Sequence, residues 1–374
     1  MGKRRRHKKN KEKAPVKEEG EEHKKEKAEH SKREKAEHLK KEEEEYGGAH
    51  EKKPSIEEIN RQFELIAKIK KEIAKVVTGQ EKIVDSLIMA FLCDGHVLLE
   101  GVPGIAKTLA IKTIAIVSGC TSNRIQFTVD LLPTDITGVT TYIPGKGFET
   151  IKGPIFANFI IADEINRSPS KTQSALIEAM QEKQVTISKT TFPLPKPFFV
   201  MATQNPLEQS GVYTLPEAQI DRFLFKLIMG YPEYSEEEKI MSENMTLKKF
   251  EEFDLKPIIS SGEILKMQAI TKKVYLDDKI KKYILNIVRK TRTKDFKYGN
   301  YIGWGCSPRA SIGLFIASKA KALMDGRNFV IPSDVRDVAH NILRHRIILT
   351  YRARAEGIDS DKIIDEILDK ENPL

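Results

Sequence analysis

Five short apolar runs in the middle of the chain constrain its fold more than any other feature. Helix-like segments or turn-rich insertions separate them, and the runs are HVLLE (96–100), RIQFTV (124–129), FANFIIAD (156–163), FFVMAT (198–203) and FLFKLIM (223–229). Alternation of short apolar strands with helices is typical of a largely parallel sheet covered on both faces. We therefore predict an α/β fold with a mostly parallel, five-stranded sheet flanked by helices.

The segments on either side of these runs indicate how the folded part is divided. Ser55 and Glu58 match a capping box, and apolar residues then recur at helical spacing, so a helix is expected to open the folded part. Beyond Gly230 the pattern is helical almost throughout. We predict an α/β core at residues 54–231 and an all-helical lid domain at residues 232–374.

The positive charge of the chain is concentrated at its N-terminal end. Residues 1–53 contain 19 Lys/Arg and 14 Glu with almost no apolar side chains, so they carry +5 of the net charge of +9. Such a segment buries too little apolar surface to offset its chain entropy, and we predict a disordered charged tail. A solvated tail and an arm that binds RNA, DNA or another polyanion both fit this composition.

Cysteine usage and hydropathy indicate where the protein works. Cys93, Cys120 and Cys306 lie far apart, without a disulfide framework or zinc-ligand spacing, which favours a reducing compartment. No apolar run approaches the ~20 residues that span a bilayer, and no hydrophobic segment of a secretory signal follows the basic N-terminus. We therefore expect a cytoplasmic protein with no membrane span.

The stretch GVPGIAKT (101–108) fits the phosphate-binding pattern G-x-x-x-x-G-K-[ST], except that Ala106 stands where glycine is usual. It follows a predicted strand and precedes a predicted helix, where backbone N–H groups can converge on phosphate oxygens. In this pattern Lys107 reaches the β- and γ-phosphates, and Thr108 is a ligand of Mg²⁺. The predicted nucleotide-binding residues of this stretch are Gly101, Val102, Pro103, Gly104, Ile105, Ala106, Lys107, Thr108 and Leu109.

A second nucleotide-site signal is the pair of carboxylates that ends FIIADE (159–164). Asp163 can hold the water shell of Mg²⁺, and Glu164 can orient or deprotonate the attacking water. Alone, an Asp–Glu pair is equally compatible with a solvated strand end. Its position about fifty residues after the glycine-rich loop strengthens the prediction of a hydrolytic nucleotide site.

Four stretches are specific enough to carry a family resemblance. They are GVPGIAKT, DEINRSPSKTQSALIEAMQEKQVT from Asp163, ATQNPLEQSGVYTLPEAQIDRF (202–223) and SPRA (307–310). Together they resemble the MoxR family of AAA+ ATPases, over about Ile56 to Leu368. The resemblance implies an AAA+ core, a helical lid, ATP and Mg²⁺ as cofactors, and a homo-oligomeric ring that is often a hexamer.

The resemblance also implies roles for residues outside the glycine-rich loop. Asn205 matches sensor 1, whose amide can bridge the γ-phosphate and the lytic water, although a turn asparagine fits the residues equally well. Arg309 matches sensor 2, and Ser307 suits a helix start that brings Arg309 to the phosphates; a plain surface arginine is the alternative. Gly79 and Gln80 fall where the family lines the adenine pocket.

One arginine matches a residue that acts on a neighbouring subunit. Arg222 in AQIDRF corresponds to the arginine finger, which neutralises developing charge and is worth ~10³–10⁵ in rate for such fingers. From the residues alone, a salt bridge from Arg222 to Asp221 or Glu217 is the simpler interpretation. Arg167 in DEINR is a second candidate for the trans-acting arginine.

Two insertions indicate where force is delivered to a client. Residues 131–154 carry glycines and threonines between two core strands, and residues 184–197 have the pattern of a hairpin before the sensor-1 strand. In related ring ATPases such elements tend to face the pore or the substrate, whereas a surface loop fits either segment equally well.

Taken together, these signals predict Mg²⁺-dependent ATP hydrolysis by a ring-forming ATPase that remodels or matures protein complexes. The resemblance implies a client that carries a von Willebrand factor A domain. A nucleic-acid motor or metal-chelatase motor subunit, with nucleic acid bound by the basic tail, is one alternative. A nucleotide-controlled binding scaffold with little turnover is another, and the glycine-to-alanine departure at Ala106 leaves room for it.

Overall fold

The computed structural model describes residues 53–77, 80–101, 107–205, 212–230 and 253–373, together with Tyr234, Glu237 and Glu238. For Lys107 and Thr108 only the helical backbone is described. Apart from Lys53, the predicted tail lies outside these residues, as do the predicted core–lid boundary at 231–232 and most of the helix expected at 235–245. Residues Ala49–Leu374 form one compact unit.

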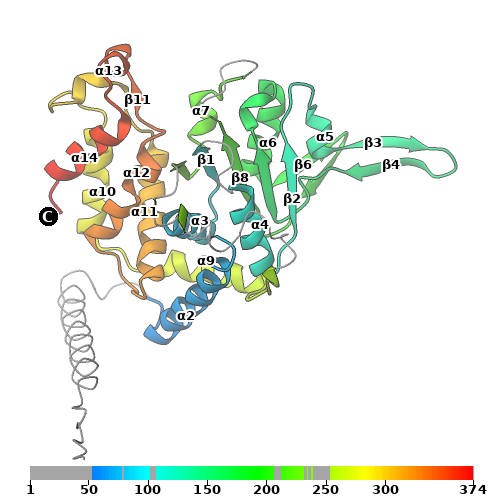
Figure 1. The fold of residues 1–374 in the computed structure, drawn as a ribbon, viewed down its shortest axis with the longest axis horizontal. Helices are drawn as coiled ribbons and strands as arrows, with labels where there is room; N and C mark the ends of the chain where they lie inside the picture. Colours follow the sequence, from blue (N-terminus) through cyan, green and yellow to red (C-terminus); the bar gives the residue numbers. More distant parts are fainter. Residues whose placement is uncertain are drawn as a thin grey trace, which may run out of the picture. The chain divides into compact units, whose positions relative to one another are not determined.

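The core is built on a five-stranded sheet in the order β2–β5–β8–β1–β9, and all of its pairings are parallel (Figure 1). The predicted five-stranded parallel sheet is therefore confirmed. Leu98 and Leu99 are both fully buried although consecutive side chains of a strand point to opposite faces, so both faces of the sheet are covered. Its strands are β1 Val97–Gly101, β2 Ser122–Gln126, β5 Phe159–Asp163, β8 Phe199–Gln204 and β9 Phe225–Met229.

The helices of the core differ in how they begin, and several of them lack a side-chain cap. The first of them has the predicted capping box, in which the Glu58 amide donates to Ser55 Oγ across 3.1 Å and the Ser55 amide donates to Glu58 Oε2 across 3.0 Å. Helix α4 packs on β5, and α3 packs on β9. The core helices are α2 Ile56–Ile73, α3 Glu81–Leu92, α4 Lys107–Val117, α5 Pro133–Thr137, α6 Ser170–Glu182 and α7 Glu217–Ile220.

Both predicted insertions contain antiparallel hairpins. Strands β3 (Gly138–Ile143) and β4 (Gly147–Lys152) project from the core as a long two-stranded arm (Figure 1). Strands β6 (Gln184–Ile187) and β7 (Thr190–Pro193) form the hairpin that the sequence predicts before the sensor-1 strand. Glycine is required at position 138, where φ is +103° and a Cβ would lie 2.3 Å from the carbonyl oxygen of residue 151.

The C-terminal part is helical, as predicted, with one addition. Strands β10 (Ile302–Trp304) and β11 (Ile348–Leu349) form a short antiparallel pair that the sequence pattern did not indicate, because runs of two or three residues carry no periodicity. In the described parts of the chain, no helix is both long and apolar enough to cross a membrane. The lid helices are α9 Ser261–Lys273, α10 Asp278–Lys290, α11 Pro308–Met324, α12 Pro332–Leu343, α13 Tyr351–Ala355 and α14 Ser360–Lys370.

The lid packs directly on the core. Helix α11 contacts α2 and α3, and α12 contacts β9. Hydrogen bonds support this packing: Gln268 Nε2 donates to the Phe91 carbonyl across 2.8 Å, and Asn341 Nδ2 donates to Ser86 Oγ across 3.2 Å. Core and lid are therefore joined by buried apolar contacts together with polar contacts from the lid.

Candidate nucleotide site

Four of the predicted site residues, Gly101, Asp163, Glu164 and Asn205, lie at the carboxyl ends of core strands. Strand β8 lies between β1 and β5, with Leu99 opposite Thr203 and Ala162 opposite Ala202. The carboxyl ends of parallel strands meet at one edge, so the end of β1, the carboxylates after β5 and the residues after β8 are neighbours.

The described ends of the glycine-rich stretch are a strand and a helix, as the sequence predicts. Gly101 ends β1 and is buried, and α4 begins at Lys107, with Leu109 half-buried in its first turn. Val102 to Ala106, and the side chains of Lys107 and Thr108, lie outside the described residues. Of the predicted adenine-pocket residues, Gly79 also lies outside them, whereas Gln80 is the N-cap residue of α3.

The carboxylate of Asp163 is held from both neighbouring strands. Thr203 Oγ1, on β8, donates to Asp163 Oδ1 across 2.5 Å. Arg124, on β2, donates to Asp163 Oδ2 through Nε at 3.1 Å and Nη2 at 2.6 Å. Because β5 lies between β2 and β8, these residues reach the same carboxylate from opposite sides.

The backbone of Glu164 is held in an unusual conformation. Its φ and ψ are 57° and 49°, the left-handed region, which costs a residue with a Cβ roughly 1–2 kcal/mol. The Glu164 amide donates to Thr203 Oγ1 across 2.9 Å. The single Thr203 hydroxyl therefore accepts from Glu164 and donates to Asp163, which fixes the two carboxylate residues relative to each other.

The side chain of Glu164 is also held by two polar neighbours. Gln126 Nε2 donates to Glu164 Oε2 across 2.9 Å, and Arg167 Nε lies 3.2 Å from the same oxygen. The amide oxygen of Gln126 accepts from Arg124 Nη2 at 2.7 Å, so the amide nitrogen of Gln126 is the group that faces Glu164. A polar chain thus runs from Asp163 through Arg124 and Gln126 to Glu164.

Asn205 and the turn after Glu164 complete this edge of the sheet. Asn205 is buried directly after β8, and residues 206–211 lie outside the described part. Gln173 Nε2 donates to the carbonyl oxygens of Ile165, Ser168 and Tyr213 at 3.0–3.2 Å. The segment that leads to α7 is therefore tied to the turn that carries Glu164.

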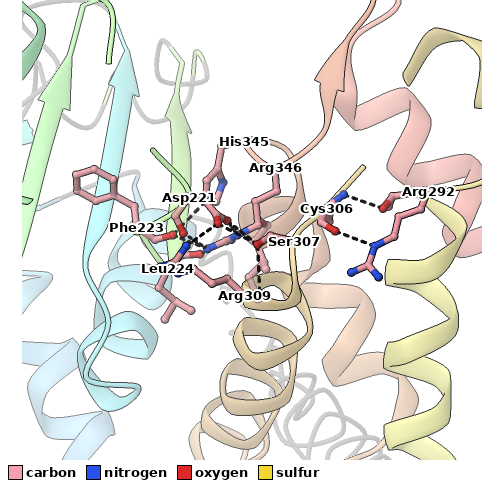
Figure 2. Close-up of polar contacts among 11 residues, drawn as sticks. Asp221, Phe223, Leu224, Arg292, Cys306, Ser307, Arg309, His345 and Arg346 are labelled. Atoms are coloured by element: carbon pink, nitrogen blue, oxygen red, sulfur yellow. Dashed lines mark hydrogen bonds and ion pairs between the residues drawn. The ribbon is translucent and has the colours of Figure 1, made fainter. Parts of the chain in front are cut away.

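The two remaining predicted arginines are both close to Asp221: Arg222 follows it in the sequence, and Arg309 contacts it (Figure 2). Arg309, at the start of α11, donates through Nη1 to Asp221 Oδ2 across 3.1 Å, and with 49% of its side chain exposed it also fits a surface arginine. Asp221 precedes the amino end of β9, whereas Asp163 ends β5 at the carboxyl edge of the parallel sheet, so one chain does not bring Arg309 to Asp163 and Glu164. Arg222 follows Asp221 and is half-buried. In the part of the chain that the structure describes, no ion pair joins Arg222 to Asp221 or Glu217. Instead, Asp221 accepts from lid residues.

The described donors at this edge fit a particular kind of metal site. Asp163 offers one carboxylate at the carboxyl end of β5, and no group of three or more His, Cys, Asp or Glu side chains that could hold a metal is found among the described residues. Mg²⁺ commonly takes one or two carboxylates and completes its shell with water and substrate phosphates. The residues present therefore fit a magnesium ion that arrives with a nucleotide.

Several residues of this arrangement were not predicted from the sequence. Arg124 and Gln126 alternate on β2 and so share a face of that strand, which is a detectable signal once β2 is known to pair with β5. Thr203 is the last residue of the otherwise apolar run FFVMAT, so the sequence pattern predicts only that it belongs to a strand. Asp221 and the lid arginine Arg346 are joined only by the tertiary fold.

Comparison with known protein families finds a match for the core and another for the lid. Residues 96–225 match the model of the ATPase family associated with various cellular activities (AAA), and residues 299–367 match the model of the AAA lid domain. A parallel five-stranded sheet that matches the AAA model, followed by a lid that matches the AAA lid model, defines an AAA-type ATPase module.

Similarity to individual proteins shows to which family of AAA-type ATPases the chain belongs. Chaperone MoxR1 of Mycobacterium tuberculosis is 44% identical over 326 residues, which cover 86% of this chain and 85% of that protein. Protein MoxR of Methylorubrum extorquens is 27% identical over 321 residues, or 79% and 92% of the two chains. A crystal structure of a Cytophaga hutchinsonii protein, proposed to be an ATPase, superimposes with a TM-score of 0.79 at 45% identity and covers 84% of this chain and 97% of that one. The chain belongs to the MoxR family of AAA+ ATPases.

Proposed function

We propose that this protein hydrolyses ATP with Mg²⁺ at a site shared by adjacent subunits of a ring, with a hexamer favoured. Hydrolysis would drive chaperone-like remodelling or maturation of a partner protein complex. The observation that carries the proposal is the position of Glu164, whose carboxylate is held by Gln126 and Arg167 directly after Asp163 at the carboxyl edge of the sheet.

The residues of the chain divide the chemistry among them. Lys107 would neutralise the phosphates, and Thr108 and Asp163 would hold Mg²⁺, which stabilises charge on the β- and γ-phosphate oxygens when it is bound. Glu164 would orient and deprotonate the attacking water, assisted by the Asn205 amide. Thr203 serves both carboxylate residues through one hydroxyl, so metal binding and water activation are supported by the same side chain.

The surroundings of Arg222 support an ATP site that is shared between adjacent subunits. A guanidinium that is half-buried and not paired with Asp221 or Glu217 in the described part of its own chain remains available for a phosphate of a neighbouring subunit. Arg167 already lies against Glu164 of its own chain, so we favour Arg222 as the trans-acting finger.

The test of the hydrolytic role is Glu164→Gln. We expect ATP binding to persist while steady-state phosphate release is lost, because the amide keeps the shape of the side chain but is not a base. Full ATPase activity in this variant would contradict the role. Negligible phosphate release by the unmodified protein would favour a nucleotide-controlled scaffold instead.

The same variant can identify the client. Glu164→Gln in the presence of ATP should hold the ring in its client-bound arrangement, so affinity purification followed by mass spectrometry should recover that client. The name of the mycobacterial relative supports a chaperone role. The resemblance to the family leads us to expect a protein with a von Willebrand factor A domain.

The basic composition of residues 1–53 favours one alternative, a motor that acts on nucleic acid. ATPase activity that DNA or RNA stimulates, and that loses this stimulation when residues 1–53 are removed, would support it. Equal activity with and without nucleic acid would argue against it.

A further inference from the structure

Three consecutive lid residues bind the main chain of the core segment that contains Arg222, and Figure 2 shows the contacts of two of them, His345 and Arg346. Arg344 Nη1 donates to the Lys226 carbonyl across 3.1 Å, and His345 Nε2 lies 3.1 Å from the Phe223 carbonyl. Arg346 makes the largest set of contacts. The turn after α12 therefore binds residues 221–226 through their backbone carbonyls as well as through one side chain.

Arg346 uses every donor of its guanidinium. Nε donates to Asp221 Oδ1 across 2.8 Å, and Nη2 donates to the carbonyl oxygens of Asp221 at 3.1 Å and Phe223 at 2.7 Å. Nη1 donates to the carbonyl oxygens of Leu224 at 3.1 Å and Ile342. A guanidinium has five N–H groups, and all five have acceptors here. Only 3% of the side chain is exposed, so these contacts are shielded from water.

These contacts hold the main chain on both sides of Arg222. Before it, Asp221 is bound through its carboxylate and its carbonyl; after it, Phe223 is fully buried and its carbonyl accepts from Arg346. Asp221 also accepts from Ser307 Oγ at 2.9 Å and from Arg309 Nη1 at 3.1 Å. The segment that carries Arg222 and the helix start that carries Arg309 thus meet at one carboxylate.

We propose that Arg346 is a positioning residue for Arg222. It fixes the backbone from which Arg222 reaches the site of the neighbouring subunit, and through Asp221 it aligns that backbone with Arg309. This inference rests on the proposed function, in which Arg222 acts in trans. According to this proposal, a lid residue of one subunit influences the rate of ATP hydrolysis in the neighbouring subunit.

The assignment predicts a defect of a particular kind. Misplacement of a catalytic group by about 1 Å can cost ~10² in rate. Arg346→Met should therefore lower kcat about 10²-fold with KM for ATP changed less than about twofold, because Asp163 and Glu164 of the variant's own site take no part in the contacts that Arg346 makes. The double variant Arg222→Ala/Arg346→Met should be no slower than Arg222→Ala, because both changes act through one group.

The decisive experiment mixes subunits. Arg346→Met subunits keep their own Lys107, and Lys107→Ala subunits keep a well-placed Arg222. Mixed rings should recover turnover to at least about tenfold above either variant alone. No recovery at any mixing ratio would overturn the proposal, because it would place the defect of Arg346→Met in its own site or its own fold.

A second mixing experiment, with Arg222→Ala and Lys107→Ala subunits, distinguishes failure of this inference from failure of the proposed function. If Arg222→Ala mixed with Lys107→Ala also gives no recovery, the trans-acting finger is wrong, and the inference falls with it. If that mixture recovers while Arg346→Met with Lys107→Ala does not, only the positioning role of Arg346 is wrong. Arg346→Lys, which keeps the charge beside Asp221 but lacks the guanidinium fork, replaces the methionine variant if the latter does not fold.

Two further measurements exclude a purely structural role. Arg336, on helix α12 just before the turn that carries Arg346, donates to the Leu368 carbonyl and to Asp369 within the lid, so Arg336→Met is the matched control. Its kcat should stay within about twofold, and an equal loss in both variants would overturn the assignment. Hydrogen–deuterium exchange without nucleotide should show faster exchange of the amides of residues 221–224 in Arg346→Met. Unchanged exchange would count against the proposal.

Discussion

The Gln126 amide donates to the Glu164 carboxylate across 2.9 Å, from the outermost strand of the sheet to the end of the neighbouring strand. The orientation of this amide is fixed because its oxygen accepts from Arg124, which also binds Asp163. The predicted base and the predicted metal ligand are therefore connected through two side chains that the motif itself does not contain.

Gln126→Leu removes the donor to Glu164 with little change in size. A hydrogen bond to a charged group contributes about 1.5–3 kcal/mol, so kcat should fall about ten- to hundredfold while the affinity for ATP stays within about twofold. Steady-state ATPase kinetics with an equilibrium nucleotide-binding titration would measure both. Asn123→Ala, on the same strand, is the control, since Asn123 donates to the Pro154 carbonyl. Unchanged kcat in Gln126→Leu would show that this contact does not position the base.

Thr203→Val removes the hydroxyl that serves both Asp163 and Glu164. Thr203 is only 1% exposed, so the Glu164 amide would be left without its acceptor at a cost of about 1–3 kcal/mol in the free energy of unfolding. The Mg²⁺ concentration for half-maximal ATPase activity should rise, because Asp163 loses its orienting donor. Thr203→Ser keeps the hydroxyl and should retain both properties. Equal behaviour of the valine and serine variants would refute the shared-hydroxyl role.

A buried ion pair within the lid gives a stability prediction. Arg327 donates to Asp334 through Nη1 at 2.7 Å and Nη2 at 2.5 Å, and Asp334 also accepts from the Ile331 amide. Asp334→Ala leaves a buried cation without its main partner and should reduce the free energy of unfolding by about 3–5 kcal/mol. Urea denaturation would measure this loss. Asp325→Ala, whose carboxylate is more exposed and contacts the same arginine, should cost much less.

The buried residue His96 predicts how stability depends on pH. Its Nε2 faces the Met180 carbonyl, its Nδ1 accepts from the Val200 amide, and burial lowers its pKa to about 4. The folded state therefore binds fewer protons than the unfolded state, whose histidine pKa is near 6.5. The stability that neutral His96 contributes is present above about pH 6.5 and is lost as the pH falls toward 4, by up to about 3 kcal/mol.

Urea unfolding at several pH values between about 7 and 5 would measure that loss. Burial also lowers the pKa of His345, so both histidines act in the same direction. His96→Gln should flatten the profile, because glutamine does not titrate. A profile of unchanged slope in this variant would contradict the assignment to His96.

The sequence predicts those parts of the fold that depend on local pattern. The strands containing Leu98 and Val200 were found because buried parallel strands are continuously apolar, and the helix after Ser55 because its cap is local. The β10–β11 pair was missed because Ile302–Trp304 and Ile348–Leu349 are too short to show a period.

The contacts that complete the candidate site depend on strand order and lid packing, which no local pattern specifies. Thr203 meets Asp163 because β8 lies beside β5, although 40 positions separate the two residues in sequence. Arg346 meets Asp221 across a separation of 125 positions, from a different domain of the fold. Motifs therefore indicated Asp163, Glu164 and Arg222, but not the side chains that hold them.

The central claim is that ATP is cleaved at a site completed by a neighbouring subunit. The most direct measurement is the rate of ATP turnover per subunit as the protein is diluted, with the oligomeric state followed in parallel by mass photometry. The rate should fall as rings dissociate and should return when the protein is concentrated again. A monomer that hydrolyses ATP at the same rate at every dilution would contradict the claim.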